Sequence, residues 1–531
     1  MENSYNIANV SNNPYTNYYT PIQLILPLDV SIIINSSDPV YKFDEVMRGV
    51  NLKKYLVSAD SKDSRGRKGY NPVSLLKVIL FGFLLKGYVS TRELADLCVN
   101  DIRFCWLLRF DKTFPSHMTI SNFINKYLKQ NIEDIFKEIT GYIIKKDNVD
   151  MSHLYIDGTK LEANANKYTW VWKKACITNR DKLFVKMTEQ LKEVNKDLSF
   201  QNIQIGEREV YEIEYVRQII ETIKNTYSLD PKNFAHGKGA RKTQGQRFYE
   251  FFDTALGRLI TYADKLEIIG ENRGSYSKTD KDATFMRIKT DYMGNDQLLP
   301  AYNIQFGVCD QYITVLDVNQ YASDQDCFIP LMNKFKSLYK TLPEYTIADA
   351  GYGSLRNYDY CEANGIKKYM KFTMFDKEIK DAKYHNNPFR PVNFKVNEKG
   401  NLVCPNNQEF IKIKESKIKD NDYGRTMEVH QCVNCEGCPL RSKCHKSKDN
   451  RKINLNKTLT AYHEEVMNNL CSIHGALLLM NRSIMSEGAF GVMKQDRYYK
   501  RIYRRGLESV TMELYLVAIG HNLYKYKNKN R

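Results

Sequence analysis

The sequence contains no uninterrupted apolar run of the roughly 20 residues that a membrane-spanning helix requires. The apolar stretch Ile22 to Ile34 carries Asp29, and it has neither a basic segment before it nor a small-residue cleavage site after it, so it does not fit a signal peptide. A P-loop and a dinucleotide-binding fingerprint are also missing, which argues against an NTP-driven motor. These absences argue against a membrane or exported protein and leave a cytoplasmic one as the expectation.

Acidic residues are fewer than basic ones. The chain of 531 residues has 79 Lys and Arg against 62 Asp and Glu, which gives a formal net charge of +17. Such a surplus favours a polyanionic partner, nucleic acid before an acidic membrane surface. A merely basic soluble protein is the alternative. The length predicts about three domains.

Cysteines are concentrated in one segment. Five of the twelve lie between residues 404 and 444, and the others are scattered singly in apolar contexts. Four thiolates in tetrahedral geometry form a structural zinc site, whereas a tight Cys-x2-Cys-x2-Cys run also suits an iron–sulfur cluster. We favour zinc because the segment is basic and lacks redox companions, and a segment without metal is the alternative. The favoured ligands are Cys404, Cys435, Cys438 and Cys444, with Cys432 spare.

The hydrophobic pattern predicts an α/β protein with a mixed sheet and several helical parts. The expected order is an irregular leader over residues 1–40, a helical DNA-binding-like domain over 41–148, an α/β core over 149–375 and 456–531, a helical insertion within that core over 175–275, and a Cys-rich insertion over 376–455.

The helical N-terminal region has clear start and stop signals. Asn71-Pro72 begins a helix that Gly87 ends, and Ser90 with Glu93 resembles a capping box for the next helix. Short helices joined by tight turns are compatible with a helix-turn-helix module. A plain helical bundle explains the pattern equally well.

Two acids follow apolar strand-like runs. Asp157 comes after Leu154-Tyr155-Ile156, and Asp349 comes after a run from Tyr345 to Ala348. In an α/β sheet, ligands usually bind at the carboxyl ends of the strands. Phosphodiester chemistry uses two Mg²⁺ ions held by carboxylates, so the two acids are candidate ligands. The alternative is that each is a cap or turn residue.

A third acid, Glu487, opens a basic stretch. At helical spacing Glu487, Lys494, Arg501 and Arg505 share one face, and the helix is predicted to end near Arg504-Arg505-Gly506. An acid followed by a basic stripe would hold a metal at one end and follow a phosphate backbone along the rest. An exposed helix of mixed charge is the alternative.

Further basic residues lie just after Asp157, in a segment of small and polar residues that suits close approach to phosphates. Trp170 and Trp172 in the same stretch would contact unstacked bases or pack under the helical insertion. The full set of candidate DNA contacts is Lys160, Lys167, Lys173, Lys174, Lys494, Arg497, Lys500, Arg501, Arg504 and Arg505.

At these positions the sequence resembles the DDE-type transposases of bacterial insertion sequences. The motifs that carry the resemblance are GYNPVSLLKVILFGF (69–83), PSHMTISNF (115–123), YIDGTKLEANANKYTWVWKK (155–174), YTIADAGYGS (345–354), CPLRSKC (438–444) and SEGAFGVMKQDRYYKRIYRRG (486–506). The resemblance extends from about residue 40 to about residue 526. In EGAFGVMK the chain departs from relatives, which usually have a bulkier first apolar pair.

The resemblance implies an RNase H-like catalytic core in which Asp157, Asp349 and Glu487 bind Mg²⁺ or Mn²⁺. It also implies a helical N-terminal part that binds DNA ends. Asp280 and Asp282 also resemble a family motif, but we assign them supporting or structural roles. The expected partner is double-stranded DNA, both element ends and target, bound by a homodimer in the bacterial cytoplasm at the nucleoid, with no membrane. The cysteine segment varies among relatives, so the resemblance supports zinc least.

The expected function is therefore a transposase that binds terminal inverted repeats and catalyses Mg²⁺-dependent cleavage and strand transfer. Two rivals remain at the level of sequence. One is a metal-dependent DNA nuclease that never joins DNA, and the other is a catalytically inactive DNA-binding protein that uses its helical and basic parts alone.

Overall fold

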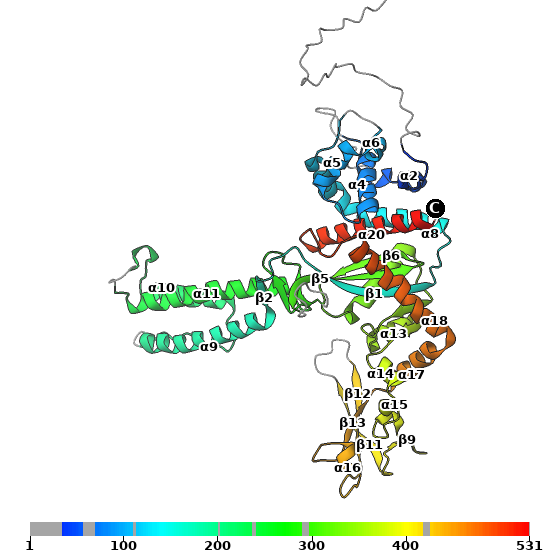
Figure 1. The fold of residues 1–531 in the computed structure, drawn as a ribbon. Helices are drawn as coiled ribbons and strands as arrows, with labels where there is room; N and C mark the ends of the chain where they lie inside the picture. Colours follow the sequence, from blue (N-terminus) through cyan, green and yellow to red (C-terminus); the bar gives the residue numbers. More distant parts are fainter. Residues whose placement is uncertain are drawn as a thin grey trace, which may run out of the picture.

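The computed structural model describes residues 34–56, 70–109, 113–199, 202–235, 241–288, 297–417 and 425–529. Of the leader expected over residues 1–40, residues 1–33 lie outside this range. The chain forms a central body from which one helical arm and one small sheet extend in different directions (Figure 1).

A mixed sheet of six strands forms the centre of the body. Its order is β4-β5-β1-β7-β8, with β6 also paired to β5. The antiparallel part contains β1 (His153–Glu162), β4 (Thr284–Arg287), β5 (Leu298–Cys309) and β6 (Tyr312–Asn319), and the parallel part adds β7 (Tyr345–Ala348) and β8 (Lys367–Met370) to β1. The helices η5 (Gln325–Cys327), α12 (Phe328–Tyr339) and α13 (Leu355–Ala363) form the crossovers. The predicted fold class, an RNase H-like mixed sheet core with a helical N-terminal part, is confirmed.

The apolar runs 301–308 and 312–318 predict a hairpin that turns at Asp310-Gln311, and β5 and β6 form it. Its turn residues Asp310 and Gln311 have φ of 47° and 72°, as a type I′ turn requires. Next to this turn, Asn522 accepts a hydrogen bond from the Ile313 amide at 2.8 Å and donates one to the Ile313 carbonyl at 2.7 Å. This side chain therefore covers polar backbone groups of the edge strand β6.

The N-terminal helices pack on one another above the sheet. They are α2 (Pro39–Gly49), η1 (Lys53–Tyr55), α4 (Pro72–Lys86), α5 (Thr91–Asn100), α6 (Ile102–Leu107), α7 (His117–Phe123), the π-helical η2 (Ile124–Leu128) and α8 (Lys129–Lys146). The predicted signals act as expected at α4 and α5. Asn71 accepts hydrogen bonds from the amides of residues 73 and 74, Gly87 ends α4 at φ 78°, and the Ser90 hydroxyl accepts from the Glu93 amide at 3.2 Å.

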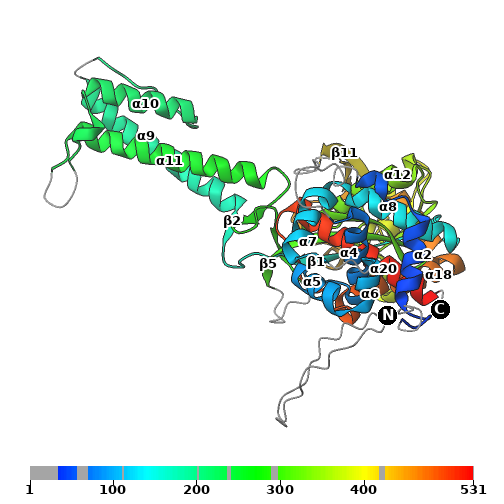
Figure 2. The ribbon, with the colours of Figure 1, turned by 90° about the horizontal axis from the view of Figure 1, so that it is seen from above.

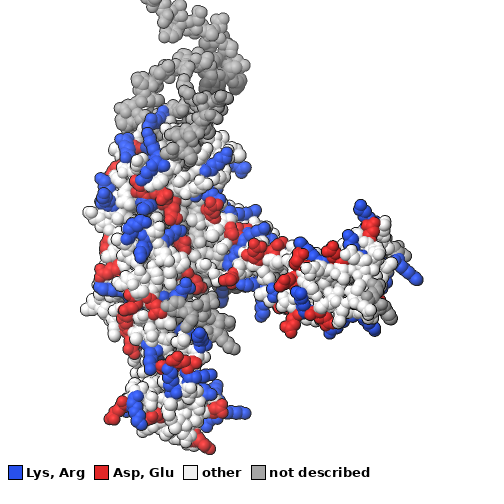
Figure 3. Space-filling model, turned by 180° about the vertical axis from the view of Figure 1, so that it is seen from behind, with Lys and Arg blue, Asp and Glu red and all other residues white. Residues whose placement is uncertain are grey.

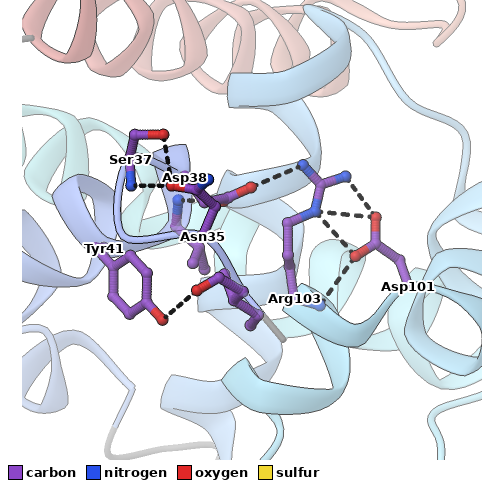
Figure 4. A network of polar contacts seen from close by, with 8 residues as sticks. Asn35, Ser37, Asp38, Tyr41, Asp101 and Arg103 are labelled. Atoms are coloured by element: carbon purple, nitrogen blue, oxygen red, sulfur yellow. Dashed lines mark hydrogen bonds and ion pairs between the residues drawn. The ribbon is translucent and has the colours of Figure 1, made fainter. Parts of the chain in front are cut away.

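One arginine joins the starts of two of these helices. Arg103 donates to both carboxylate oxygens of Asp101, which caps α6, and lies 3.6 Å from the carboxylate of Asp38, which caps α2 (Figure 4). The planar guanidinium suits this two-sided pairing.

The last helix, α20 (Leu507–Lys529), lies between the N-terminal helices and the sheet (Figure 1). It is buried on almost every side, as expected for a helix with little amphipathic character. It contacts α4 and α8 on one side and β6 on the other, so the chain's end ties the two parts of the body together.

The helical insertion forms an arm that projects from the body in two perpendicular views (Figures 1 and 2). It consists of α9 (Lys173–Leu198), α10 (Ile213–Thr226), η4 (Pro231–Asn233) and α11 (Gln244–Ile269), and it begins and ends at the strand pair β2 (Trp170–Trp172) and β3 (Ser275–Ser277). Its apolar repeats form a core separate from that of the body, as the helical periodicity predicts.

The Cys-rich insertion forms a second sheet of order β13-β12-β11-β10-β9. Its elements are α14 (Phe375–Lys380), α15 (Ala382–His385), η6 (Pro391–Asn393), β9 (Lys395–Val396), β10 (Leu402–Val403), β11 (Glu409–Lys417), β12 (Thr426–Cys432), α16 (Arg441–Cys444) and β13 (Lys452–Leu455).

The chain then returns to the body through a broken helical run. Helices α17 (Lys457–Cys471) and α18 (Ile473–Arg482) lead into the π-helical turn η7 (Ser483–Glu487), the short α19 (Gly488–Gly491) and a second π-helical turn, η8 (Val492–Asp496). No single helix in the described ranges is long and apolar enough to cross a membrane; only the pair α4 and α5, bent by 100°, passes that test together.

Candidate active site

Asp157 occupies a place where β1 changes its neighbours. The sequence suggested the carboxyl end of a strand, but Asp157 lies in the middle of β1, opposite Phe306 of β5. Pairing of β1 with the parallel strand β7, however, stops at Tyr155. Asp157 therefore lies just beyond the end of the β1–β7 pairing, as predicted. It does not lie at the end of β1, because β1 continues along β5 beyond the end of β7.

Asp349 follows the last residue of β7 directly, as predicted. Its carboxylate accepts a hydrogen bond from the Gly351 amide at 2.8 Å. A Cβ on Gly351 would lie 3.0 Å from the Asp349 carboxylate and 3.5 Å from that of Asp324. The close turn therefore brings a fourth acid, Asp324, next to Asp349, and no strand or helix pattern in the sequence pointed to it.

Glu487 ends the π-helical turn η7, which contacts both β1 and β5. Phe490, just beyond it, stacks on Phe306 with ring centroids 4.4 Å apart and planes at 8°. This packing brings the third acid to the same part of the sheet as Asp157. Arg482 lies between the two acids: it donates to Glu487 at 2.6 Å and lies 3.9 Å from the Asp157 carboxylate.

The charges of the other two predicted acids act on Asp157. The pKa of Asp157 is raised to about 6, first by burial and further by the negative charges of Asp349 and Glu487, while Arg482 and the Gly158 amide act in the opposite direction. Acids from three distant parts of the sequence therefore form one charged cluster.

Buried polar side chains form the floor of this cluster. Asn303 and Gln305, which project from the same face of β5, both donate to the Asp324 carboxylate, at 2.7 and 3.2 Å. The Tyr352 hydroxyl donates to Gln305. Gly158 lies against this network, because a Cβ at that position would clash with the side chains of Gln305 and Tyr352. These hydrogen bonds tie β5 to the loop that carries Asp324 and to the turn after β7.

A cavity of about 1020 Å³ lies beside the cluster. It is lined by five of the predicted DNA contacts, namely Lys160, Lys167, Lys494, Lys500 and Arg501. Lys494 connects the cavity to the acids: its ammonium donates to Thr159, burial lowers its pKa, and the charge of Asp157 opposes that shift. Tyr168 also lines the cavity, and 71% of this residue's surface is exposed to solvent.

The predicted basic helical stripe is wrong as a helix. The helical run ends at Asp496, and Tyr498 has φ of 56°. The chain then runs beside the end of β1, where the Ile502 amide donates to the Glu162 carbonyl at 2.9 Å. Glu513, fully buried in α20, accepts from the Tyr499 hydroxyl and from the amides of residues 503 and 504. This acid anchors the segment and prevents the helix from continuing.

Two residues predicted to contact DNA instead form hydrogen bonds within the protein. Arg497 donates to the carbonyls of Phe83 and Leu84 and lies over the ring of Tyr524, so its expected role in positioning phosphates is not supported. Lys173 binds carbonyls at the end of α11.

The remaining basic candidates differ in their surroundings. Arg504 donates to Asn125 at 2.9 Å and Arg505 to the Asn164 carbonyl at 2.7 Å, whereas Lys174 is exposed on the first turn of α9. On the face seen in Figure 3, basic and acidic side chains are mixed over both body and arm. On that face, the positive surplus is not gathered into one patch.

Asp280 and Asp282 have structural partners, in line with the role assigned to them. Asp280 accepts from the Tyr302 hydroxyl at 2.9 Å and from the Gly506 amide at 3.2 Å, and Asp282 accepts from the Leu507 amide at 2.8 Å. They hold the start of α20.

Two parts of the chain match known family models. Residues 403–527 match the model described as transposase DDE domain, and residues 29–126 match one described as transposase domain (DUF772). Both matches support a DDE-type transposase of an insertion sequence. No curated protein and no solved structure matches the chain. The first match includes Glu487, while Asp157 and Asp349 lie outside both.

The cysteine segment forms a small cavity of its own. All five cysteines of the segment line it together with His445 and Arg451. Backbone amides donate to the sulfurs of Cys404 and Cys435 at 3.4 Å. Cys432, taken as spare, lies among the others, and burial raises the pKa of its thiol to about 12.

Whether the two candidate sites can hold metal ions depends on where their ligand side chains lie and on which donor atoms they offer. Among the described residues of the chain, no group of three or more His, Cys, Asp or Glu side chains is placed to hold a metal ion. The donor chemistry nevertheless fits at both sites, since Mg²⁺ and Mn²⁺ prefer carboxylate oxygens and zinc prefers thiolates. At the acidic cluster, the Arg482 guanidinium contacts the oxygens that an ion would use.

Proposed function

We propose that this transposase binds the terminal inverted repeats of its element and catalyses Mg²⁺-dependent DNA cleavage and strand transfer. The observation that carries the proposal is the cluster of Asp157, Asp349 and Glu487, which are far apart in sequence. Arg482 contacts both Asp157 and Glu487, and the charges of Asp349 and Glu487 add to burial in raising the pKa of Asp157. The cavity lined by lysine and arginine side chains next to it supports a phosphate-bearing substrate.

The three acids would hold the Mg²⁺ or Mn²⁺ ions. When bound, two such ions activate the attacking oxygen and stabilise the leaving oxygen of an in-line displacement. In the first reaction a water oxygen attacks a phosphorus at the element end and releases a 3′ hydroxyl. In the second, that hydroxyl attacks a phosphorus of the target DNA, forms a new phosphodiester bond and displaces a 3′ oxygen of the target strand.

The basic residues of the cavity would position phosphates. Lys494, held by Thr159 beside Asp157, lies nearest the reacting groups. Lys160, Lys167 and Lys500 would contact the backbone further along the cavity. Arg501 would do the same and not act as a base, because a guanidinium does not lose its proton near neutral pH.

The helical N-terminal region, which contains the second family match, would bind the element ends. Two ends must meet for transposition, and a homodimer with one end per copy satisfies that need. This assignment predicts that removing a carboxylate of the cluster abolishes reaction without abolishing binding.

A joining assay tests the proposal. The substrates are a linear duplex with the DNA that flanks the chain's own coding sequence, a target plasmid and Mg²⁺. Wild type should give joined products, and Asp349→Asn should bind the duplex with unchanged affinity and give none. Cleavage without joined product would indicate a nuclease, and binding with no cleavage in wild type would indicate an inactive DNA-binding protein. Either result contradicts the proposal.

We also propose structural zinc at Cys404, Cys435, Cys438 and Cys444. The amide donors to two of these sulfurs are of the kind that stabilise thiolates. Metal analysis of the purified protein should find one zinc per chain. Cys435→Ser should lose it and Cys432→Ser should keep it; absence of zinc from wild type, or loss in both variants, would contradict this ligand set.

A further inference from the structure

Arg482 contacts two of the three acids, Glu487 and Asp157. Its Nη2 donates to Oε1 of Glu487 at 2.6 Å, and its Nη1 lies 3.9 Å from Oδ1 of Asp157. The side chain is only 15% exposed, whereas that of Glu487 is 49% exposed. The arginine is therefore largely buried beside the acids, whereas Glu487 is open to solvent.

The local backbone explains why this contact forms. Residues five apart on an ideal α-helix point about 140° away from each other, so Arg482 and Glu487 would not meet on one. The turn between them, Ser483–Glu487, is π-helical, and its wider spacing brings residues five apart to the same side. The buried Ser486 hydroxyl donates to the Arg482 carbonyl at 2.9 Å, which supports the turn. Such turns are rare and are frequent at functional sites.

The contact has an electrostatic reason as well. Asp157, Asp349 and Glu487 bring three negative charges together in a partly buried place, and like charges at such distances are unfavourable. The guanidinium offsets this repulsion, and its two donors reach two carboxylates at once. A divalent ion would offset the same repulsion and would bind the same Glu487 and Asp157 oxygens.

We propose that Arg482 is a positioning residue that competes with divalent cations for Asp157 and Glu487. It holds the two carboxylates in place until an ion displaces the guanidinium, so that loading of the site requires the arginine to move. This inference rests on the proposed function, because it takes these acids as metal ligands. It adds a built-in competitor that sets how tightly the site binds its ions.

Calorimetric titration of Mn²⁺ into the full chain, without DNA and at pH 8, tests the inference. Arg482→Gln keeps a polar side chain of similar length and removes the competing charge. It should bind Mn²⁺ about tenfold more tightly than wild type, the order expected for loss of one nearby positive charge in a screened site. Arg258→Gln, on an exposed position of the distant arm, removes one positive charge elsewhere and should bind as wild type does.

Unchanged or weaker binding by Arg482→Gln would overturn the inference, because a merely structural arginine would stabilise the fold without opposing the ion. If circular dichroism shows that this variant does not fold, Arg482→Lys carries the test. Its single ammonium cannot hold both carboxylates, so affinity above wild type supports competition and affinity equal to or below wild type refutes it.

The same titration separates this inference from the proposed function. Asp349→Asn should bind Mn²⁺ much more weakly than wild type. If wild type shows no binding that depends on Asp349, the proposed function fails. If Asp349→Asn weakens binding but neither Arg482 variant strengthens it, only the competition fails.

Discussion

Asp157→Asn should stabilise the protein in the absence of divalent ions. The pKa of Asp157 is raised to about 6, chiefly by burial, and its side chain is 18% exposed. Against an ordinary Asp pKa near 3.9, this difference corresponds to about 3 kcal/mol. Asparagine occupies the same volume and does not ionise, so it escapes that penalty.

The sign of the pH dependence follows from proton binding. The folded state holds the Asp157 proton more tightly than the unfolded state, so the stability of wild type falls as pH rises from about 4 to about 6. Above pH 6 the full penalty applies, and near pH 4 almost none does. The variant should therefore exceed wild type by up to about 3 kcal/mol at pH 8 and by little near pH 4.

Urea denaturation in EDTA, followed by far-ultraviolet circular dichroism at both pH values, measures the difference. Asp253→Asn, at an exposed position of α11, is the control and should change stability by less than about 0.5 kcal/mol. Added Mn²⁺ should stabilise wild type and not Asp157→Asn, since only a protein that binds the ion gains from it. A variant no more stable than wild type at pH 8, or a difference independent of pH, would refute the reasoning.

Three other predictions concern the surroundings of the site. Gly158→Ala should destabilise the fold by about 1–3 kcal/mol in urea and weaken Mn²⁺ binding, because its Cβ would clash with Gln305 and Tyr352; unchanged values for both would contradict the described floor. Glu513→Ala leaves three donors without their acceptor, so limited trypsin digestion should cut residues 497–506 faster than in wild type, and equal rates would argue against the anchor. Burial lowers the pKa of His521 to about 3, so as pH falls the unfolded state binds a proton that the folded state does not. Between pH 7 and pH 5 the free energy of unfolding of wild type should therefore fall by about 2 kcal/mol more than that of His521→Gln. Parallel pH profiles of the two proteins would contradict this.

Sequence reasoning succeeded where a local signal sets the structure. Asn71 and Gly87 mark both ends of α4 because capping depends on neighbouring residues alone. The β5–β6 hairpin follows from two apolar runs and a turn at residues 310 and 311. Asp349 was placed correctly because β7 ends where its apolar run ends.

It failed where contacts between elements, or an irregular helical turn, decide the outcome. The basic stripe was expected to be helical, but Glu513, on a later helix, binds the backbone after Asp496 and ends the run. Arg482 was missed because its partner is five residues away, a spacing that brings side chains together only in a π-helical turn. Asp324 was missed because it lies in a loop, and it is placed at the site by hydrogen bonds from Asn303 and Gln305 of β5.

The central claim is that Asp157, Asp349 and Glu487 surround one metal site. Fe²⁺ bound in place of Mg²⁺ generates hydroxyl radicals with peroxide and ascorbate, and these cut the backbone close to the ion. Cuts are expected near residues 157, 349 and 487 together, suppressed by excess Mg²⁺ and lost at all three places in Asp349→Asn. Cuts near only one of these positions, or cuts that persist in Asp349→Asn, would contradict it.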